Sequence, residues 1–471
     1  MATYTKKIAA NTIIQVIGKV ITTAIAVVML AYLARYLGVG GYGNYTTVFA
    51  FLEFFAIIAD MGFYTIAVRE IAKDPESAHK VMGNIFSLRV IFALVFLIIA
   101  PIIGFLIPSY IEVVKIGILV GTFSSFFVLL NQIFVSIFQA HLRMDRSVIS
   151  DVAARIVLFV LVLVFIRLGF SLQFFILANV IANLVAVLIS FSLSRKFLFF
   201  KPLFDLRYWK SITKEALPLG IIIVLGLIYF KVDTIMLSIM KNSVAVGIYG
   251  APYKILEILI TIPSIFMGSV FPLISRYIKE GDARFKESFK TSFDFMLMLA
   301  IPLVIGIFLL AKPIVYLVLG PEFSGSVVVL KYLIFAVLII FLGTIMGNFV
   351  VAANLQKKLV WVYLFSVFFN IIGNLILIPR YSYIGSSVAT IATEFLVCSC
   401  AYIIVYKNLG LVPRLGILFK TLIAGSIMGL ILYHFNGINL FLLIIIGSAM
   451  YFVVLYLIGG IKKEMILKMI K

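Results

Sequence analysis

Hydrophobic residues occur in long unbroken runs along this chain, and short polar segments separate the runs. An α-helix needs roughly 20 apolar residues to cross the hydrocarbon core of a bilayer, and runs of that length recur about fourteen times. A membrane β-barrel would instead show weak alternation over about ten residues. The pattern predicts an all-α, polytopic membrane protein. The expected spans are 8–33, 45–68, 82–107, 116–139, 148–169, 171–194, 216–240, 249–274, 292–319, 327–351, 359–378, 384–405, 415–434 and 438–459.

Composition excludes the main alternative class, a water-soluble globular protein. Hydrophobic residues make up 64% of the chain and charged residues only 12%. A soluble domain could not bury that much apolar surface in its core. The polar segments between the runs are therefore expected to be membrane-surface loops.

The basic residues give a formal net charge of +20, which on its own could indicate a nucleic-acid partner. Their distribution indicates topology instead, because 27 of the 39 Lys and Arg residues lie at the N-terminus, in the C-terminal tail and in every second loop. This alternation is the positive-inside pattern, so both termini are expected on the cytoplasmic side of the cell membrane. No nucleic-acid partner is expected, whereas basic loops of this kind attract anionic membrane lipids.

A short stretch repeats and indicates two related lobes. Residues 43–53 return as residues 247–257, and each copy runs from a polar turn into a hydrophobic span. The identical pairs are Gly43 and Gly247, Tyr45 and Tyr249, Leu52 and Leu256, and Glu53 and Glu257. The interval holds six spans, and an even number makes the repeats parallel. The sequence therefore predicts six-helix lobes at 1–204 and 205–408, followed by an additional transmembrane pair with a basic tail at 409–471.

The junction of these lobes, residues 195–210, interleaves aromatic residues with cations. Aromatic rings and basic side chains together favour the boundary between lipid and water. We expect this segment to lie on the membrane surface.

Motifs for metal, cofactor or covalent chemistry are not found in the sequence. Cys398 and Cys400 are two residues apart and so face different sides of a helix, which favours neither a disulfide nor a metal site. Residues 38–43 match G-x-G-x-x-G literally but follow a hydrophobic helix instead of a strand. We expect no metal and no cofactor.

The informative chemistry lies in cations within the expected spans, where each costs several kcal/mol unless it faces water or a partner. Lys19 completes a polar stripe with Asn11 and Gln15 on one face of the first span. Arg89 and Arg155 each lie about seven residues inside their spans, or roughly 10 Å deep. Arg89 has no acidic neighbour in its own helix, so a water-filled cavity is expected around it and Lys19.

Carboxylates within the spans could neutralise these cations or carry a coupling ion. The candidates are Glu53, Asp60, Asp233 and Glu257, and span seven adds a cation at Lys231. Local ion pairs are the alternative, since Asp151 lies four residues before Arg155 and Lys254 lies three before Glu257.

Several stretches resemble a known family in their order and spacing. They are Leu33–Gly38 with Tyr42–Gly43, Asp60–Phe63 with Arg69–Glu70, Lys231–Leu237, Val246–Tyr249 with Tyr253–Lys254, Phe271–Arg276, and Asn370 through Ile378–Arg380 to Gly385–Thr390. Over roughly residues 5–410, the chain is similar to the polysaccharide-exporter branch, the Wzx-type flippases, of the multidrug/oligosaccharidyl-lipid/polysaccharide superfamily. The final helix pair departs from the twelve spans of many members and is similar to the additional helices of lipid II flippases.

The resemblance implies a flippase that moves a polyprenyl- or dolichyl-linked oligosaccharide to the outer leaflet by alternating access, with polysaccharide-assembly membrane proteins as possible partners. It implies that the phosphate or pyrophosphate of the carrier lipid is bound by Lys19, Arg89, Arg155 and Lys231. It also implies that charge is balanced, or an ion coupled to transport, by Glu53, Asp60, Asp233 and Glu257.

Two other functional classes of membrane protein would show different features. A cation or drug exporter of the related MATE branch would share the lobes but is expected to prefer an acidic cavity. A membrane glycosyltransferase or polymerase usually has a large outer loop, whereas the outer loops here are about ten residues or shorter. We expect a transporter and no enzyme.

Overall fold

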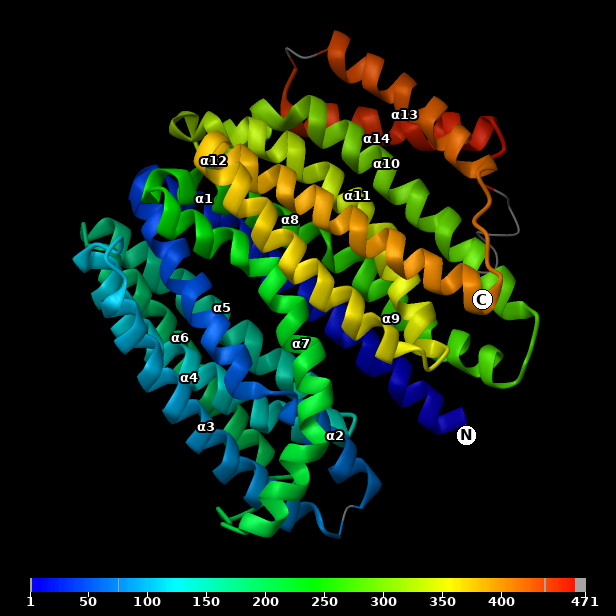
Figure 1. Cartoon of the computed structure of the whole chain (residues 1–471). Helices are drawn as coiled ribbons and strands as arrows, with labels where there is room; N and C mark the ends of the chain where they lie inside the picture. Colours follow the sequence, from blue (N-terminus) through cyan, green and yellow to red (C-terminus); the bar gives the residue numbers. More distant parts are fainter. Residues whose placement is uncertain (1, 75, 436–437, 462–471) are drawn as a thin grey trace. The chain divides into compact units, whose positions relative to one another are not determined.

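The computed structural model describes residues 2–74, 76–435 and 438–461, and within them every regular element is a helix (Figure 1). In the described residues, 12 helical segments are long and apolar enough to cross a membrane. Two of them continue through a sharp break, at Gly38 (φ 65°) and at Ser382 (φ 51°). Each half has more than the roughly 20 residues that a span needs, so each broken segment supplies two spans. The predicted all-α, polytopic membrane fold is confirmed.

The first compact unit covers Met1–Gly250. Its helices are α1 (Ala2–Asp60), α2 (Phe63–Lys73), α3 (Ala78–Leu106), α4 (Glu112–Ala140), α5 (Met144–Arg167), α6 (Leu172–Ser194), α7 (Leu206–Met240) and the first part of α8 (Ser243–Leu259). Clusters of buried apolar residues hold the helices together. Phe63, Ile85 and Ile137 join α2, α3 and α4, while Leu52 and Ile176 belong to a cluster of α1, α4 and α6.

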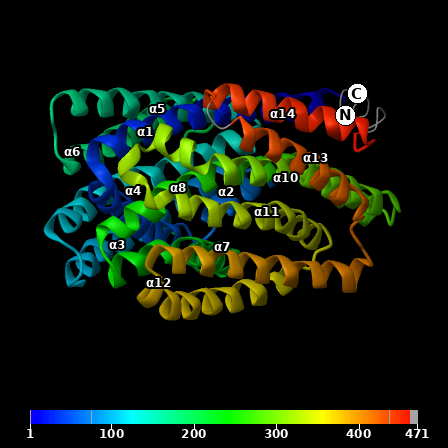
Figure 2. The same ribbon diagram turned by 90° about the horizontal axis from the view of Figure 1, so that it is seen from above.

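The second compact unit covers Ala251–Lys471. It contains the rest of α8, then α9 (Thr261–Lys279), α10 (Arg284–Val318), the short 3-10 helix η1 (Pro321–Phe323), α11 (Gly325–Ala352), α12 (Gln356–Leu409), α13 (Gly416–His434) and α14 (Leu440–Leu457). Helices α11 and α12 run side by side (Figure 2), and α13 and α14 both pack on α10. The span predicted at 249–274 lies within the candidate span Ser243–Lys279, in which α8 and α9 meet at Ile260. The end of the predicted basic tail, residues 462–471, lies outside the described residues.

The units divide at Gly250, whereas the predicted lobes divide at residues 204 and 408. Helix α7 packs against α1, α2 and α3, which groups it with the first unit. The six-helix repeat is a relationship between sequences, and these contacts do not test it. It stays a prediction.

The two glycines of the repeated stretch lie against each other where α1 packs on α8. A Cβ atom on Gly43 would collide with the backbone oxygen of Ser243 and lie 2.9 Å from the nitrogen of Gly247. A Cβ atom on Gly247 would collide with the backbone oxygen of Val39. Backbone therefore touches backbone at this crossing, which only glycine permits.

A buried hydrogen bond joins α14 to α10 in the second unit. The Tyr451 hydroxyl donates to the backbone oxygen of Met298 at 3.0 Å, and the tyrosine is fully buried. Replacing Tyr451 by phenylalanine is expected to lower the free energy of unfolding by about 1 kcal/mol, because the carbonyl loses its partner. Thermal unfolding in detergent would measure this, with Tyr456→Phe on the exposed face of α14 as the control. Equal melting temperatures for the two variants would contradict the prediction.

Candidate functional site

The charged residues predicted within the spans fall into separate groups, and seven of the eight lie in the first unit. The exception is Glu257, whose carboxylate pairs with Lys254 at 2.6 Å in the second unit. The local ion pair, which was the alternative to a coupling role at this position, is therefore present.

Arg89 lies in the interior of the first unit, with only 2% of its surface exposed. Its guanidinium, on α3, forms an ion pair with Asp60 on α1 and donates a hydrogen bond to Gln132 Oε1 on α4 at 2.8 Å. The expected water-filled cavity around Arg89 is therefore wrong for this conformation. Its nearest acidic partner comes from another helix, which spacing within one helix cannot reveal.

The Arg89 guanidinium is incompletely satisfied. Its Nε and Nη1 atoms are buried and form no hydrogen bond within the described chain. A buried donor without an acceptor costs free energy, and the cost is larger for a charged group. Arg89 and Asp60 thus form a buried polar centre that α1, α3 and α4 enclose. Their charges balance, but two nitrogen atoms of the guanidinium lack an acceptor within the described residues.

Two residues next to this centre were not among the predicted site residues. The Tyr64 hydroxyl donates to Gln139 Oε1, which connects α2 to α4. Tyr64 lies four residues after Asp60, and Gln139 lies seven after Gln132. The spacing of Gln132 and Gln139 repeats one face of α4, so a search for polar residues at i+7 would have found Gln139. Tyr64 is separated from Asp60 by the helix break at residues 61–62, so helix spacing could not have found it.

The cations Lys19, on α1, and Arg155, on α5, form a second group, which is exposed. Both side chains are exposed, and neither forms an ion pair within 4.0 Å in the described part of the chain. Their helices are in close contact, because a Cβ atom on Gly18 would overlap the Val148 side chain. Asp151, one turn before Arg155, interacts electrostatically with both cations. We call Lys19, Asp151 and Arg155 the α1–α5 cation site, and its net charge is positive.

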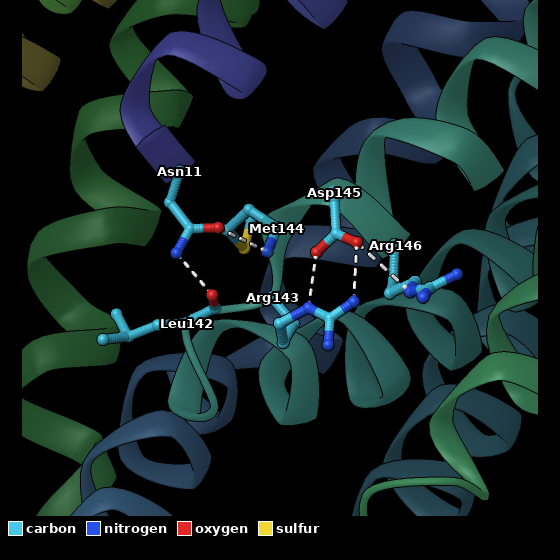
Figure 3. A network of polar contacts seen from close by, with 6 residues as sticks. All are labelled: Asn11, Leu142, Arg143, Met144, Asp145 and Arg146. Atoms are coloured by element: carbon cyan, nitrogen blue, oxygen red, sulfur yellow. Dashed lines mark hydrogen bonds and ion pairs between the residues drawn. The ribbon is translucent and has the colours of Figure 1, made fainter. Parts of the chain in front are cut away.

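A network of polar contacts sets the register of α1 against α5 (Figure 3). The buried Asn11 side chain donates to the backbone oxygen of Leu142 and accepts from the Met144 backbone nitrogen at 3.0 Å. In the same turn, Asp145 pairs with Arg143 through contacts of 2.9 and 3.0 Å. Asn11 therefore has a structural role, and it fixes the depth at which Lys19 lies two turns further along α1.

The last group lies where α7 approaches α1 and α8. Lys231 Nζ pairs with Glu53 Oε2 at 2.8 Å. Asp233 is almost fully buried and accepts a hydrogen bond from the Tyr249 hydroxyl at 3.0 Å. These residues are thus partnered in this conformation and are separate from the α1–α5 cation site.

Comparisons with known proteins agree on one superfamily. The family model described as "Polysaccharide biosynthesis protein" matches residues 8–278, and a second model, MatE, matches residues 218–376. The probable low-salt glycan biosynthesis flippase Agl15 of Haloferax volcanii is 26% identical over 166 residues. That match spans 35% of each chain, about a third of the curated relative's length.

Two solved structures share the fold. The lipid II flippase MurJ in an inward closed conformation matches with a TM-score of 0.78 and 15% identity, over 95% of this chain and 98% of MurJ. An inward-facing MATE multidrug resistance transporter matches with a TM-score of 0.65 and 14% identity, over 85% of this chain and 98% of its own. The 5% of the chain left unmatched by MurJ is shorter than residues 409–471, so that likeness extends into the C-terminal helix pair.

Proposed function

The chain belongs to the polysaccharide biosynthesis protein family, and we propose that it is a flippase for a lipid-linked oligosaccharide. The cargo is a glycan on a polyprenyl or dolichyl phosphate or pyrophosphate, which the protein carries from the cytoplasmic to the outer leaflet of the cell membrane. The proposed activity is translocation, and no covalent bond of the cargo changes. Its product supplies surface polysaccharide or glycoprotein assembly.

One contrast in the charges carries this proposal. The four candidate carboxylates are all engaged, Asp60 with Arg89, Glu53 with Lys231, Glu257 with Lys254 and Asp233 with Tyr249. Two candidate cations, Lys19 and Arg155, are exposed and unpaired in the described chain. Exposed cations among helices that span a membrane favour an anionic cargo, since an unpaired charge there needs a counter-charge or water.

Each residue of the α1–α5 cation site has a role in this mechanism. Arg155 offers a planar fork of donors that matches phosphate oxygens, and Lys19 supplies a second positive charge from the neighbouring helix. Asp151 offsets part of their positive charge without an ion pair to either cation in the described chain. The buried pair of Arg89 and Asp60 lies where α1 faces α3. In this mechanism the Arg89 guanidinium would change its partner when the helices move.

Alternating access supplies the transport step. The two predicted lobes, 1–204 and 205–408, would open in turn to the two leaflets while the cargo phosphate stays on the cations. The close crossing of α1 and α8 at Gly43 and Gly247 closes the outer side in this scheme. Asp60, Asp233, Glu53 and Glu257 balance charge or follow an ion gradient.

A MATE-like, ion-coupled exporter of small molecules is the second candidate function. The match of residues 218–376 to the MatE model favours it. A cationic drug, however, would need open carboxylates, and the candidates found here already have partners. The two functions therefore predict opposite charges for the transported molecule.

The test uses a fluorescent short-chain polyprenyl- or dolichyl-pyrophosphate sugar in proteoliposomes, whose protection from an external quencher reports flipping. Replacing Lys19 and Arg155 together by glutamine is expected to slow flipping roughly tenfold to a hundredfold, since each removes a hydrogen bond to a charged group. Arg167→Gln is the matched control, because Arg167 is exposed at the other end of α5 and should leave the rate unchanged. Equally slow flipping by the unsubstituted protein and by all variants, together with uptake of a cationic dye, would establish the exporter instead.

A further inference from the structure

A cavity of about 600 Å³ lies where the segment between α6 and α7 folds back onto the start of α3. Its lining combines three basic side chains, His79, Lys80 and Lys201, with the aromatic rings of Phe199 and Phe204. The volume is within the range of small-molecule sites, roughly 300 to 1,000 Å³. None of these residues belongs to the α1–α5 cation site.

Specific hydrogen bonds give the cavity its shape. Asn84, which is 1% exposed, accepts from the Asp205 backbone nitrogen at 3.0 Å and from Trp209 Nε1 at 3.1 Å. The Leu203 backbone nitrogen donates to the Gly83 oxygen at 3.1 Å. His79 Nδ1 donates to the Phe199 carbonyl at 2.7 Å, because a carbonyl can only accept. The segment is therefore held on α3 at both ends of the cavity.

The charge inside the cavity favours an anion. Lys201 forms no ion pair in the described chain, and Lys80 lies 6.0 Å from the centroid of the Tyr208 ring. The carboxylate in the lining, Asp205, already accepts from the backbone nitrogens of Arg207 and Tyr208 at 3.1 Å each and so caps α7. Two lysines thus remain available.

The surroundings of the cavity indicate that the anion belongs to a lipid. It lies at the start of one candidate span, Ala78–Leu106, and beyond the end of another, Leu172–Ser194, hence at the membrane surface. Phe204 and Leu206 next to it are 70% and 74% exposed. Exposed apolar groups beside cations fit the boundary between headgroups and acyl chains, whereas a site for a soluble phosphate has no use for them.

We propose that this cavity binds the phosphodiester headgroup of an anionic membrane lipid. Lys80 and Lys201 contact the phosphate, and Phe204 and Leu206 lie among the acyl chains. The bound lipid holds the segment between α6 and α7 at the membrane surface. The site is independent of the cargo and of the proposed function.

Trp209 provides a direct readout, because the chain has only two tryptophans and the other, Trp361, lies in the second unit. A Trp361→Phe protein in neutral detergent is titrated with phosphatidylglycerol or phosphatidylcholine that carries bromine in its acyl chains. Phosphatidylglycerol is expected to quench Trp209 saturably at roughly tenfold lower concentration than phosphatidylcholine, as two lysines beside an anionic headgroup imply. Adding glycerol 3-phosphate at millimolar concentration should not reverse the quenching.

Substitutions then assign the effect to the cavity. The double variant Lys80→Gln with Lys201→Gln should lose the preference for phosphatidylglycerol. The double variant Lys196→Gln with Lys210→Gln removes the same number of positive charges outside the cavity lining, and it should retain the preference. Equal quenching by the two lipids in the unsubstituted protein, or equal behaviour of the two double variants, would overturn the proposal. Reversal by glycerol 3-phosphate would show a site for a soluble phosphate and would overturn the assignment to a lipid.

Discussion

Replacing Arg89 by leucine is expected to destabilise the protein by about 3 to 5 kcal/mol, the largest loss expected of any charge substitution in the chain. Arg89 is fully buried, and its guanidinium is the ion-pair partner of Asp60. Without it, the Asp60 carboxylate must either stay charged in a poorly hydrated interior or take up a proton. Gln132 also loses its donor. Unfolding by heat or denaturant in detergent would measure the loss.

A second substitution and a control separate the ion pair from general damage to packing. Asp60→Leu added to Arg89→Leu should recover most of the stability, because replacing both partners of a buried pair by apolar groups is often neutral. Arg69→Leu is the matched control, since Arg69 pairs with Glu70 and Glu215 at the surface and should cost less than about 1 kcal/mol. A double variant as unstable as Arg89→Leu alone would contradict this account.

Replacing Gly43 by alanine should force α1 and α8 apart and slow transport strongly. The new Cβ atom would overlap the Ser243 backbone oxygen, and a backbone cannot turn aside as a flexible side chain can. Overpacking of this kind costs about 1 to 3 kcal/mol or more. In the alternating-access scheme it also prevents closure of the outer side. Because the outer side then stays open, a polar maleimide should label the Thr46→Cys variant faster. The two native cysteines, Cys398 and Cys400, are replaced by serine for this experiment.

Gly40 provides the control on the same helix. A Cβ atom there would lie 3.6 Å from Ser243 Oγ, which is an ordinary contact. Gly40→Ala has the same gain in helix propensity as Gly43→Ala but should leave flipping and labelling unchanged. If the two variants behave alike, the backbone contact at Gly43 does not limit the movement of α1 and α8.

The two polar regions of the first unit differ in what substitution would do. The Arg89 centre is enclosed and its charge is balanced by Asp60, so its removal is expected to act through stability. Lys19 and Arg155 are exposed and unpaired in the described chain, so their removal is expected to act on transport and leave folding intact. Measuring melting temperature and flipping rate for both sets would test this division directly.

The sequence by itself determined the all-α membrane fold and the approximate positions of its spans. Bilayer thickness fixes the length of each apolar run, and this constraint acts within one segment at a time. The Lys254–Glu257 pair was also readable, because residues three apart lie on the same helix face. Gly43 and Gly247 were recognisable as equivalent positions, although their contact was not.

Only the tertiary structure decided which charges are paired and which are open. Asp60 and Arg89 are 29 residues apart on different helices, and Lys231 meets Glu53 across most of the first unit's sequence. The cavity between α3 and residues 199–205 likewise joins distant segments through the buried side chain of Asn84. Helix periodicity gives the face on which a side chain lies, but packing chooses the neighbouring helix. A charge is therefore visible in the sequence, while its partner and its exposure follow from the packing.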